Sequence, residues 1–143
     1  MAYDLQVVID TQDPHNLADW WADALGWQVE RQDEAFIRSL IEKGHATDDD
    51  TTFHHGNLVW KEGAAIRHPG GLERAPRVLF QHVPEAKTVK NRVHLDIRVG
   101  ADRIDAEVDR LVGKGATMLH KGRQGPTWWV TIADPEGNEI CLA

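Results

Sequence analysis

The chain repeats one order of predicted elements, and this repeat restricts the folds that it can adopt. A strand pattern at 4–10 precedes a helix pattern that stops at Gly26, and a further strand pattern follows; the same order returns in the second half. His94 follows Gln6 by 94 − 6 = 88 residues, and Gly115 follows Gly26 by 115 − 26 = 89 residues. A repeat of whole elements at a nearly constant offset indicates two copies of one βαβββ unit.

The repeat contains one predicted helix in each copy. Each of these two helices has a single apolar face, so each should cover one face of a sheet. Asp13 supplies an N-cap to the first helix and Pro14 its first helical position. Its apolar face comprises Leu17, Trp20, Trp21, Ala24 and Leu25. The stripe of the second helix, at about 102–113, comprises Ile104, Val108, Leu111 and Val112. We therefore expect an α+β fold, in which two tandem βαβββ modules form a curved mixed sheet around a cleft and the helices lie on the outer face.

Residues from about 32 to 75 have no counterpart in the second copy and form an insertion in module one. Asp33 is the predicted cap of a short helix that continues to Lys43, with Phe36, Leu40 and Ile41 turned inward. The polar TDDDTT segment at 47–52 and the segment 68–75 are predicted loops. Short strands are predicted at 58–60 and 64–66. The insertion is therefore expected to be helical and loop-rich.

Histidines are concentrated in the insertion, which contains His45, His54, His55 and His68 together with Asp48, Asp49 and Asp50. A cluster of this composition raises the question of a metal site. Adjacent histidines on a strand point to opposite faces, however, and the other pairs lack a familiar ligand spacing. We expect a solvated lid loop here rather than a metal site.

Composition limits the partners and the compartment. The 143 residues are sufficient for one domain, with module one at about 1–85 and module two at about 90–143. A net charge of −7 without a Lys/Arg cluster argues against a nucleic-acid partner. The chain lacks an apolar run of membrane-spanning length, and MAYDLQ lacks the pattern of a secretory signal. With one cysteine, Cys141, it can form no internal disulfide, so we expect a cytoplasmic protein.

The strand NRVHLDIRV at 91–99 carries the first candidate site. It alternates apolar and polar residues, with His94 and Asp96 on the polar face. If this face points into a cleft, His94 can act as a general base that is oriented by the carboxylate of Asp96. We therefore expect these two side chains to be the catalytic pair if the chain is an enzyme.

The tandem repeat, HLDIRV at the start of module two, VPEAKTVKNRVHLDIRV at the module junction and the closing DPEGNEICLA resemble the vicinal oxygen chelate (VOC) superfamily. Within it, the chain is similar to glyoxalase-like, bleomycin-resistance and dihydroxybiphenyl-dioxygenase-type domains. The resemblance covers the whole chain except the insertion. It implies the fold described above, a single domain over 1–143, a small-molecule ligand and a homodimer.

Metal-dependent members of that superfamily bind a divalent ion through His, Glu or Gln of the first and last strands of each module. Carried over by position, the resemblance implies the set Gln6, Gln81, His94 and Cys141, with Phe80 replacing Gln81 if the register shifts by one. Two neutral amides and one thiol are poor ligands for such an ion. We therefore favour no metal cofactor. If a divalent metal binds, the expected ligands are His94, Gln6, Gln81 and Glu139.

The remaining ligand-binding candidates are aromatic side chains and residues of the implied set: Gln6, Gln81, Trp129, Trp60, Phe53 and Cys141. Trp128 and Trp129 lie on opposite faces of one strand, so one of them should line the cleft. Cys141 is read mainly as a small buried apolar residue. The favoured function is small-molecule binding or sequestration of the resistance type. The alternatives are a metal-dependent lyase or dioxygenase that uses His94, and a metal-free enzyme in which His94 and Asp96 transfer protons.

Overall fold

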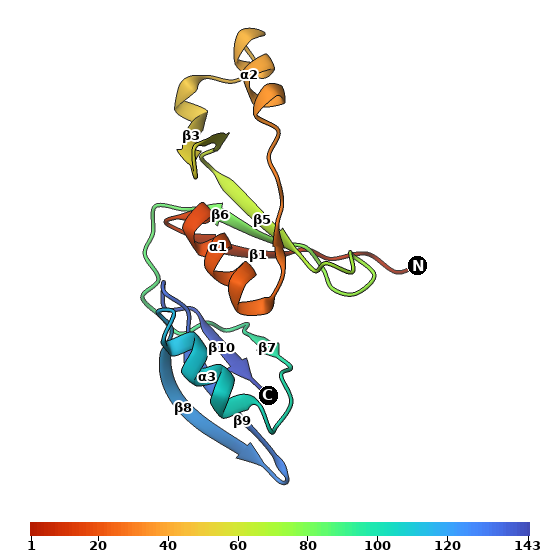
Figure 1. Cartoon of the computed structure of the whole chain (residues 1–143), viewed down its shortest axis with the longest axis vertical. Coiled ribbons are helices and arrows are strands. Elements are labelled where there is room, and N and C mark those ends of the chain that lie inside the picture. Colours follow the sequence, from red (N-terminus) through yellow and green to blue (C-terminus); the bar gives the residue numbers. More distant parts are fainter. The chain divides into compact units, whose positions relative to one another are not determined.

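The computed structural model describes residues 1–143, which divide into two compact units, Met1–Ala86 and Lys87–Ala143 (Figure 1). The elements of the first unit are β1 (Val7–Thr11), α1 (Pro14–Leu25), β2 (Gln28–Val29), α2 (Glu34–Glu42), the 3-10 helix η1 (Asp48–Asp50), β3 (Thr51–His54), β4 (Asn57–Trp60), β5 (Gly63–Arg67) and β6 (Val78–His82). Those of the second unit are β7 (Leu95–Ile97), α3 (Ile104–Val112), β8 (Thr117–Gln124), β9 (Thr127–Ala133) and β10 (Glu139–Leu142). None of the helices has the length and apolar character that crossing a membrane requires.

The two units contain sheets of the same topology. The first has the strand order β1-β6-β5-β2 and the second the order β7-β10-β9-β8. In each, the first strand runs parallel to the last, and the other pairs are antiparallel. The predicted α+β class and the tandem βαβββ repeat are thus confirmed, with two curved four-stranded sheets that do not close into a barrel.

The first helix begins and ends where its sequence signals predict. The Asp13 side chain accepts a hydrogen bond from the Asn16 N–H, and Pro14 is the first helical residue. Gly26 ends the helix in the left-handed conformation with φ of 67°, which a residue without a Cβ adopts at little cost. α1 lies over β5 and β6 (Figure 1). Its Trp21 side chain is only 1% exposed and has its ring centroid 6.2 Å from that of Phe80.

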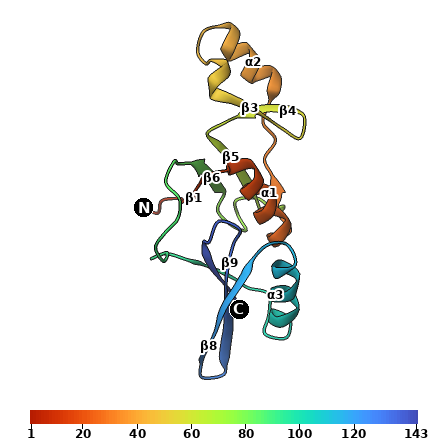
Figure 2. The ribbon, with the colours of Figure 1, turned by 90° about the vertical axis from the view of Figure 1, so that its left-hand side faces the viewer.

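The core of the second unit lies between α3 and its sheet (Figures 1 and 2). Ile104 and Leu111 of α3 are buried as predicted, whereas Val112, the last of the predicted stripe, is 43% exposed. The strands contribute the fully buried Val130, Ile132, Ile140 and Leu142. Because side chains alternate along a strand, this arrangement leaves Trp129, Thr131 and Cys141 on the opposite face of the sheet.

The insertion ends earlier than the sequence predicts. β5 is part of the first sheet, so the insertion consists of α2, η1, β3 and β4, which lie beyond one end of β5 (Figures 1 and 2). The expectation of a plain polar loop at 47–52 is wrong, because Thr47 and Asp50 form a capping box around η1. β3 follows directly and pairs with β4 in a two-stranded hairpin that the sequence reading missed.

α2 has the predicted cap but buries a different face. The Asp33 side chain accepts a hydrogen bond from the Phe36 N–H, as an N-cap does. Ile37 is 1% exposed, whereas Phe36 is 56% exposed, so the prediction that Phe36 points inward is wrong. The physical reason is that α2 packs on β4, and the Glu34 carboxylate accepts the Leu58 N–H at 3.2 Å. This contact fixes which side of α2 faces the hairpin.

Two strand boundaries also differ from the predictions. β7 has three residues rather than the seven predicted at 93–99, and Val93 is 82% exposed. β8 continues to Gln124, so the connection to β9 is the tight turn Gly125–Pro126 rather than the predicted turn at 122–126.

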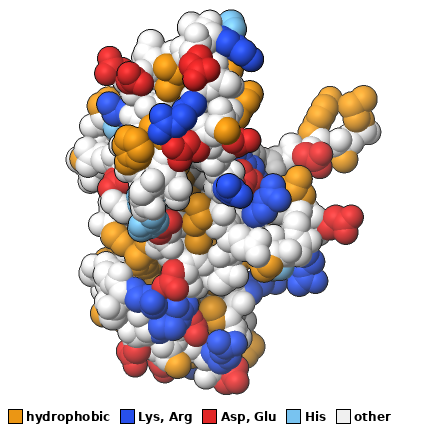
Figure 3. All heavy atoms as spheres, turned by 45° about the horizontal axis from the view of Figure 1, so that its top comes forward, with side chains coloured by type: hydrophobic (Ala, Val, Ile, Leu, Met, Phe, Trp, Pro, Cys, Tyr) orange, Lys and Arg blue, Asp and Glu red, His pale blue; other side chains and the backbone are white.

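Acidic and basic side chains are interleaved over the face seen in Figure 3, with apolar ones scattered between them.

Glu30, which follows β2, forms a bidentate ion pair with Arg77: the guanidinium donates to both carboxylate oxygens at 2.9–3.0 Å. These hydrogen bonds outweigh the effect of burial and lower the pKa of Glu30 below its ordinary value of 4.5. A group with a lowered folded pKa stabilises the fold above its unfolded pKa and loses that effect as the pH falls. We expect Glu30→Gln to destabilise by about 1 kcal/mol at pH 7.

The difference between Glu30→Gln and the wild type should shrink as the pH is lowered through 4.5 and below, because wild-type Glu30 then becomes neutral too. Urea unfolding of both proteins at several pH values measures it. Glu73→Gln, which removes an exposed carboxylate, is the control and should be neutral throughout. A destabilisation by Glu30→Gln that does not change with pH would contradict the prediction.

Candidate functional site

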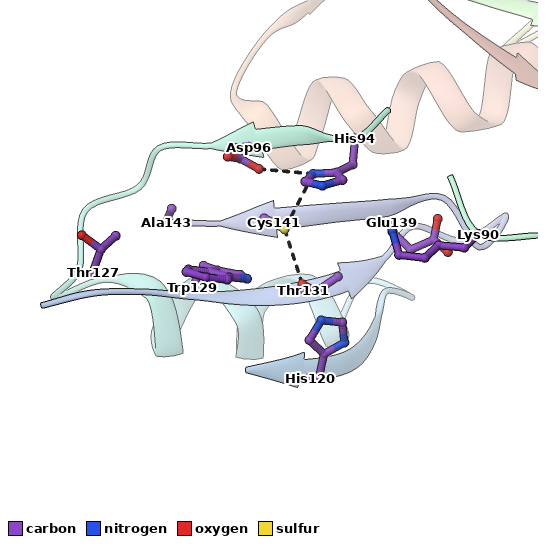
Figure 4. A pocket seen from close by; sticks show the side chains of 10 residues that line it. All are labelled: Lys90, His94, Asp96, His120, Thr127, Trp129, Thr131, Glu139, Cys141 and Ala143. Atoms are coloured by element: carbon purple, nitrogen blue, oxygen red, sulfur yellow. Dashed lines mark hydrogen bonds and ion pairs between the residues drawn. The ribbon is translucent and has the colours of Figure 1, made fainter. Parts of the chain in front are cut away.

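A pocket of about 390 Å³ lies on the face of the second sheet that is opposite α3 (Figure 4). Every residue that lines it belongs to the second unit. All four strands of the sheet contribute: Asp96 comes from β7, His120 from β8, Trp129 and Thr131 from β9, and Cys141 from β10. His94 precedes β7. The sequence-predicted residues His94, Asp96, Trp129, Glu139 and Cys141 thus lie together in one pocket.

One nitrogen of His94 faces both of its neighbours. Its Nδ1 lies 3.4 Å from Asp96 Oδ1 and 4.0 Å from Cys141 Sγ. A nucleophile–base–carboxylate relay needs the thiol on one ring nitrogen and the carboxylate on the other. The arrangement is therefore not a Cys–His–Asp relay. It leaves Nε2, which makes no hydrogen bond within the protein, to interact with a ligand (Figure 4).

Cys141 is placed by the pairing of the strands. β10 runs parallel to β7, with Cys141 opposite Asp96, and antiparallel to β9, with Cys141 opposite Thr131. The residue is 7% exposed, and its Sγ lies 3.4 Å from Thr131 Oγ1. The thiol lies beside a hydroxyl, and its 4.0 Å separation from His94 Nδ1 is long for a nucleophile–base pair. Its geometry agrees with a small residue of the pocket wall.

Trp129 supplies the flat apolar surface of the pocket (Figure 4). Its partner across the strand pair is Gly122, and a Cβ built at Gly122 would overlap the indole. The ring can lie over β8 only because the opposing residue has no side chain. Trp128, on the other face of β9, has Lys121 Nζ at 5.7 Å from its ring. The prediction that the two tryptophans divide between the faces agrees with this arrangement.

The Glu139 carboxylate is already bound by other groups of the protein. Its carboxylate accepts the Asn91 N–H at 3.0 Å and is paired with Lys87 Nζ at 3.1 Å. Burial raises the pKa of Glu139, but these hydrogen bonds and the Lys87 charge outweigh it and leave the pKa below its ordinary value. Both carboxylate oxygens are therefore occupied, which makes Glu139 a poor metal ligand.

The other predicted ligand-binding residues belong to the first unit and do not line this pocket. Gln6 precedes β1, and its Oε1 accepts a hydrogen bond from Arg77 Nη1 at 2.9 Å. Gln81 is exposed on β6. Trp60 lines a smaller cavity of about 270 Å³ together with Arg77. Phe53 is 65% exposed on the hairpin and lines neither cavity.

Strand register identifies the residue of module one that corresponds to Cys141. Val8 of β1 is opposite Leu79, in the same way as Asp96 of β7 is opposite Cys141. The corresponding residue is therefore Leu79, not Gln81 as the sequence alignment implies. Leu79 offers no donor atom, and the Gln6 amide oxygen is already bonded to Arg77. The residues present do not fit the four-ligand metal site that the superfamily implies.

Sequence reasoning missed four polar residues of the pocket: Lys90, His120, Thr127 and Thr131. Thr131 lies two residues after Trp129, so period-two alternation along β9 would have found it. His120 could not be found in this way, because a β-bulge between Met118 and His120 shifts the register of β8. Only the paired strand reveals that His120 is opposite Thr131.

A family model described as a glyoxalase-like domain matches residues 6–143. Three solved structures are similar in fold to nearly the whole chain. The fosfomycin resistance protein FosX from Mesorhizobium loti is 11% identical, with 99% of this chain and 91% of that chain covered and a TM-score of 0.59. A glyoxalase/bleomycin resistance protein/dioxygenase family enzyme from Burkholderia phytofirmans PsJN is 14% identical, with 96% of this chain and 94% of that chain covered and a TM-score of 0.62. The oxidase ChaP-H2 is 16% identical, with 99% of this chain and 93% of that chain covered and a TM-score of 0.60.

No curated protein sequence matches the chain. At these identities the solved structures establish the fold and leave the activity open. The family match nevertheless extends over nearly all of the sequence, including both sheets, and the topology of the two units agrees with it. The chain therefore belongs to the glyoxalase-like domain family of the vicinal oxygen chelate superfamily.

Proposed function

We propose that the protein binds a small organic molecule in the pocket of the second unit, without the metal centre of metal-dependent relatives. The observation that carries this proposal is the donor set. Leu79 stands at the position that corresponds to Cys141, and Arg77 holds the Gln6 amide. A divalent ion at those positions would lack the carboxylates that neutralise its charge. A binding or sequestering role needs no such ion.

The lining of the pocket supports a planar ligand that carries a polar group. Trp129 offers an extended aromatic surface, on which a flat or cationic group stacks favourably. His94 Nε2 offers one hydrogen-bonding position, because the ring's other nitrogen, Nδ1, faces Asp96. The volume of about 390 Å³ lies at the lower end of the range of small-molecule sites, about 300–1,000 Å³. This combination favours a ligand of one or two rings.

A thermal-shift screen of small ring compounds, followed by calorimetry of the hits, tests the proposal. Trp129→Leu and His94→Gln should each weaken a hit by about tenfold, which corresponds to about 1.4 kcal/mol. His45→Gln, which changes an exposed histidine of the insertion, is the control and should bind normally. The metal content of protein purified without chelator is also measured. A stoichiometric metal ion that is present in the wild type and lost in His94→Gln would contradict the proposal that the pocket works without a metal.

A second candidate function is proton transfer without a metal. It is favoured by the contact between His94 Nδ1 and Asp96 Oδ1 at 3.4 Å, which leaves Nε2 available as a general base. Such an enzyme would remove an acidic C–H or O–H proton from a molecule bound over Trp129. Turnover of a screening hit that falls in Asp96→Asn while binding persists would establish this function in place of simple binding. Binding without turnover would exclude it for that compound.

We also propose that residues 1–143 function as a single glyoxalase-like domain that assembles into a homodimer, as the superfamily resemblance implies. The solitary, buried Cys141 suits a reducing, cytoplasmic setting. Light scattering during gel filtration measures the mass directly. A species of twice 16.1 kDa is expected. A monomeric mass at all concentrations would refute the dimer.

A further inference from the structure

Outside the pocket, three side chains from two segments of the first unit, α1 and the β3–β4 hairpin, converge at one point. Asp19 belongs to α1, His54 ends β3, and His55 begins the turn between β3 and β4. Both His54 Nε2 and His55 Nε2 lie 2.7 Å from the same carboxylate oxygen, Asp19 Oδ2. The two imidazole centroids are 3.9 Å apart, and the three donor atoms lie within 4.8 Å of one another.

The backbone of His55 explains why two adjacent histidines share one side. His55 is the only residue other than glycine with a positive φ, 49°, and it precedes Gly56 with φ of 78°. His54 pairs with Asn57 across this two-residue turn. Two central residues with φ > 0 are typical of a type I′ hairpin, in which Asn-Gly is preferred. The expectation that the two histidines point to opposite faces is therefore wrong.

The surroundings of the cluster keep the hairpin next to α1. His15, one turn before Asp19, is buried, and its Nε2 donates to the Trp60 carbonyl at the end of β4 at 2.7 Å. Its ring centroid is 5.1 Å from that of His54. The side chain of His54 is 19% exposed, whereas that of His55 is 73% exposed. One side of the cluster is thus supported by packing, and the other is open to solvent.

We propose that Asp19, His54 and His55 form a binding site for a divalent transition-metal ion of the Zn²⁺ type. Two imidazoles and one carboxylate are ligands that Zn²⁺ accepts, with water in the fourth position. Ligand atoms at about 2.0–2.2 Å from a tetrahedral ion lie roughly 3.3 Å apart. The 2.7 Å contacts therefore need to open by less than an ångström. On binding, the ring protons move from Nε2 to Nδ1, and no net proton is released from neutral imidazoles.

The site has a structural consequence for the insertion. An isolated two-stranded hairpin is marginally stable in water. An ion held by α1 on one side and by both hairpin histidines on the other fixes β3 and β4 to α1. These ligands all lie outside the residues that correspond to the superfamily's metal positions. A metal found in the protein consequently need not lie in the pocket of His94.

Zn²⁺ titration of the chelator-treated full-length chain by calorimetry tests the proposal. We expect one Zn²⁺ per chain, and a loss of affinity of about tenfold or more in His55→Asn and in His54→Gln. Asn suits the left-handed turn position, so His55→Asn removes the ligand while keeping the hairpin. His45→Gln, in the same insertion, is the matched control and should retain the wild-type affinity. Asp19→Asn provides a further variant if His54→Gln fails to fold.

Co²⁺ substitution identifies the ligands independently. A tetrahedral Co²⁺ spectrum without thiolate-to-metal charge transfer is expected for two imidazoles and a carboxylate. The double variant His94→Gln, Cys141→Ser should bind Zn²⁺ and Co²⁺ as the wild type does. Equal affinity of His55→Asn, His54→Gln and the wild type, a wild type that does not bind Zn²⁺, or loss of the ion in the double variant would each overturn the proposal.

Discussion

Asp134→Ala is expected to destabilise the protein by about 3 kcal/mol, because it removes a buried carboxylate that accepts three hydrogen bonds. Asp134 is 3% exposed. Its Oδ1 accepts the N–H groups of Glu136 and Asn138, and its Oδ2 accepts the Asn138 side-chain amide, all at 2.8–2.9 Å. Alanine would leave these donors of the β9–β10 turn without their partner. For a chain of this length the melting temperature should fall by roughly 6–12 °C.

Two variants separate the hydrogen bonds of Asp134 from the loss of charge. Asp134→Asn keeps one acceptor oxygen and should cost clearly less than the alanine variant. Glu73→Gln removes an exposed carboxylate elsewhere in the chain and should change stability by less than about 0.5 kcal/mol. Thermal and urea unfolding measure all three. Equal stability of Asp134→Ala and the wild type would show that the turn is maintained by Pro135 and Gly137 alone.

Local signals predicted the secondary structure well where the chain contains explicit caps. Asp13, Pro14 and Gly26 define the limits of α1, and each acts through contacts within one turn of helix. Asp33 likewise predicted the start of α2. The face that α2 buries depends instead on the Glu34 contact with Leu58 of β4. That contact joins residues far apart in sequence, so periodicity within α2 could not predict it.

The sequence predicted those pocket-lining residues whose positions depend only on the alternation of side chains along a strand. His94 and Asp96 share the polar side of one segment, and Cys141 is opposite Asp96 on the parallel strand. For the closing strand of module one, the sequence reading gave Gln81, whereas the strand register combined with the 88-residue offset points to Leu79. His55 was also misjudged. Its positive φ interrupts the alternation on which the prediction relied.

Gly122→Ala is expected both to destabilise the second unit and to impair ligand binding. The added Cβ would overlap the Trp129 indole, whose atoms also form the apolar wall of the pocket. Overpacking of this kind costs about 1–3 kcal/mol, because the ring must leave its place over β8. With the ring displaced, a ligand that stacks on it should bind about tenfold more weakly, or about 1.4 kcal/mol.

Gly113→Ala is the matched control for Gly122→Ala. Gly113 has an ordinary right-handed backbone at the C-cap of α3, with φ of −61°, so alanine there should be neutral or slightly stabilising. The double variant Gly122→Ala, Trp129→Leu makes the test specific: the smaller side chain removes the clash, so stability should partly recover while binding stays weak. If Gly122→Ala instead bound ligand like the wild type, Trp129 could not be the surface on which that ligand stacks. Calorimetry with a screening hit, together with urea unfolding, measures both effects.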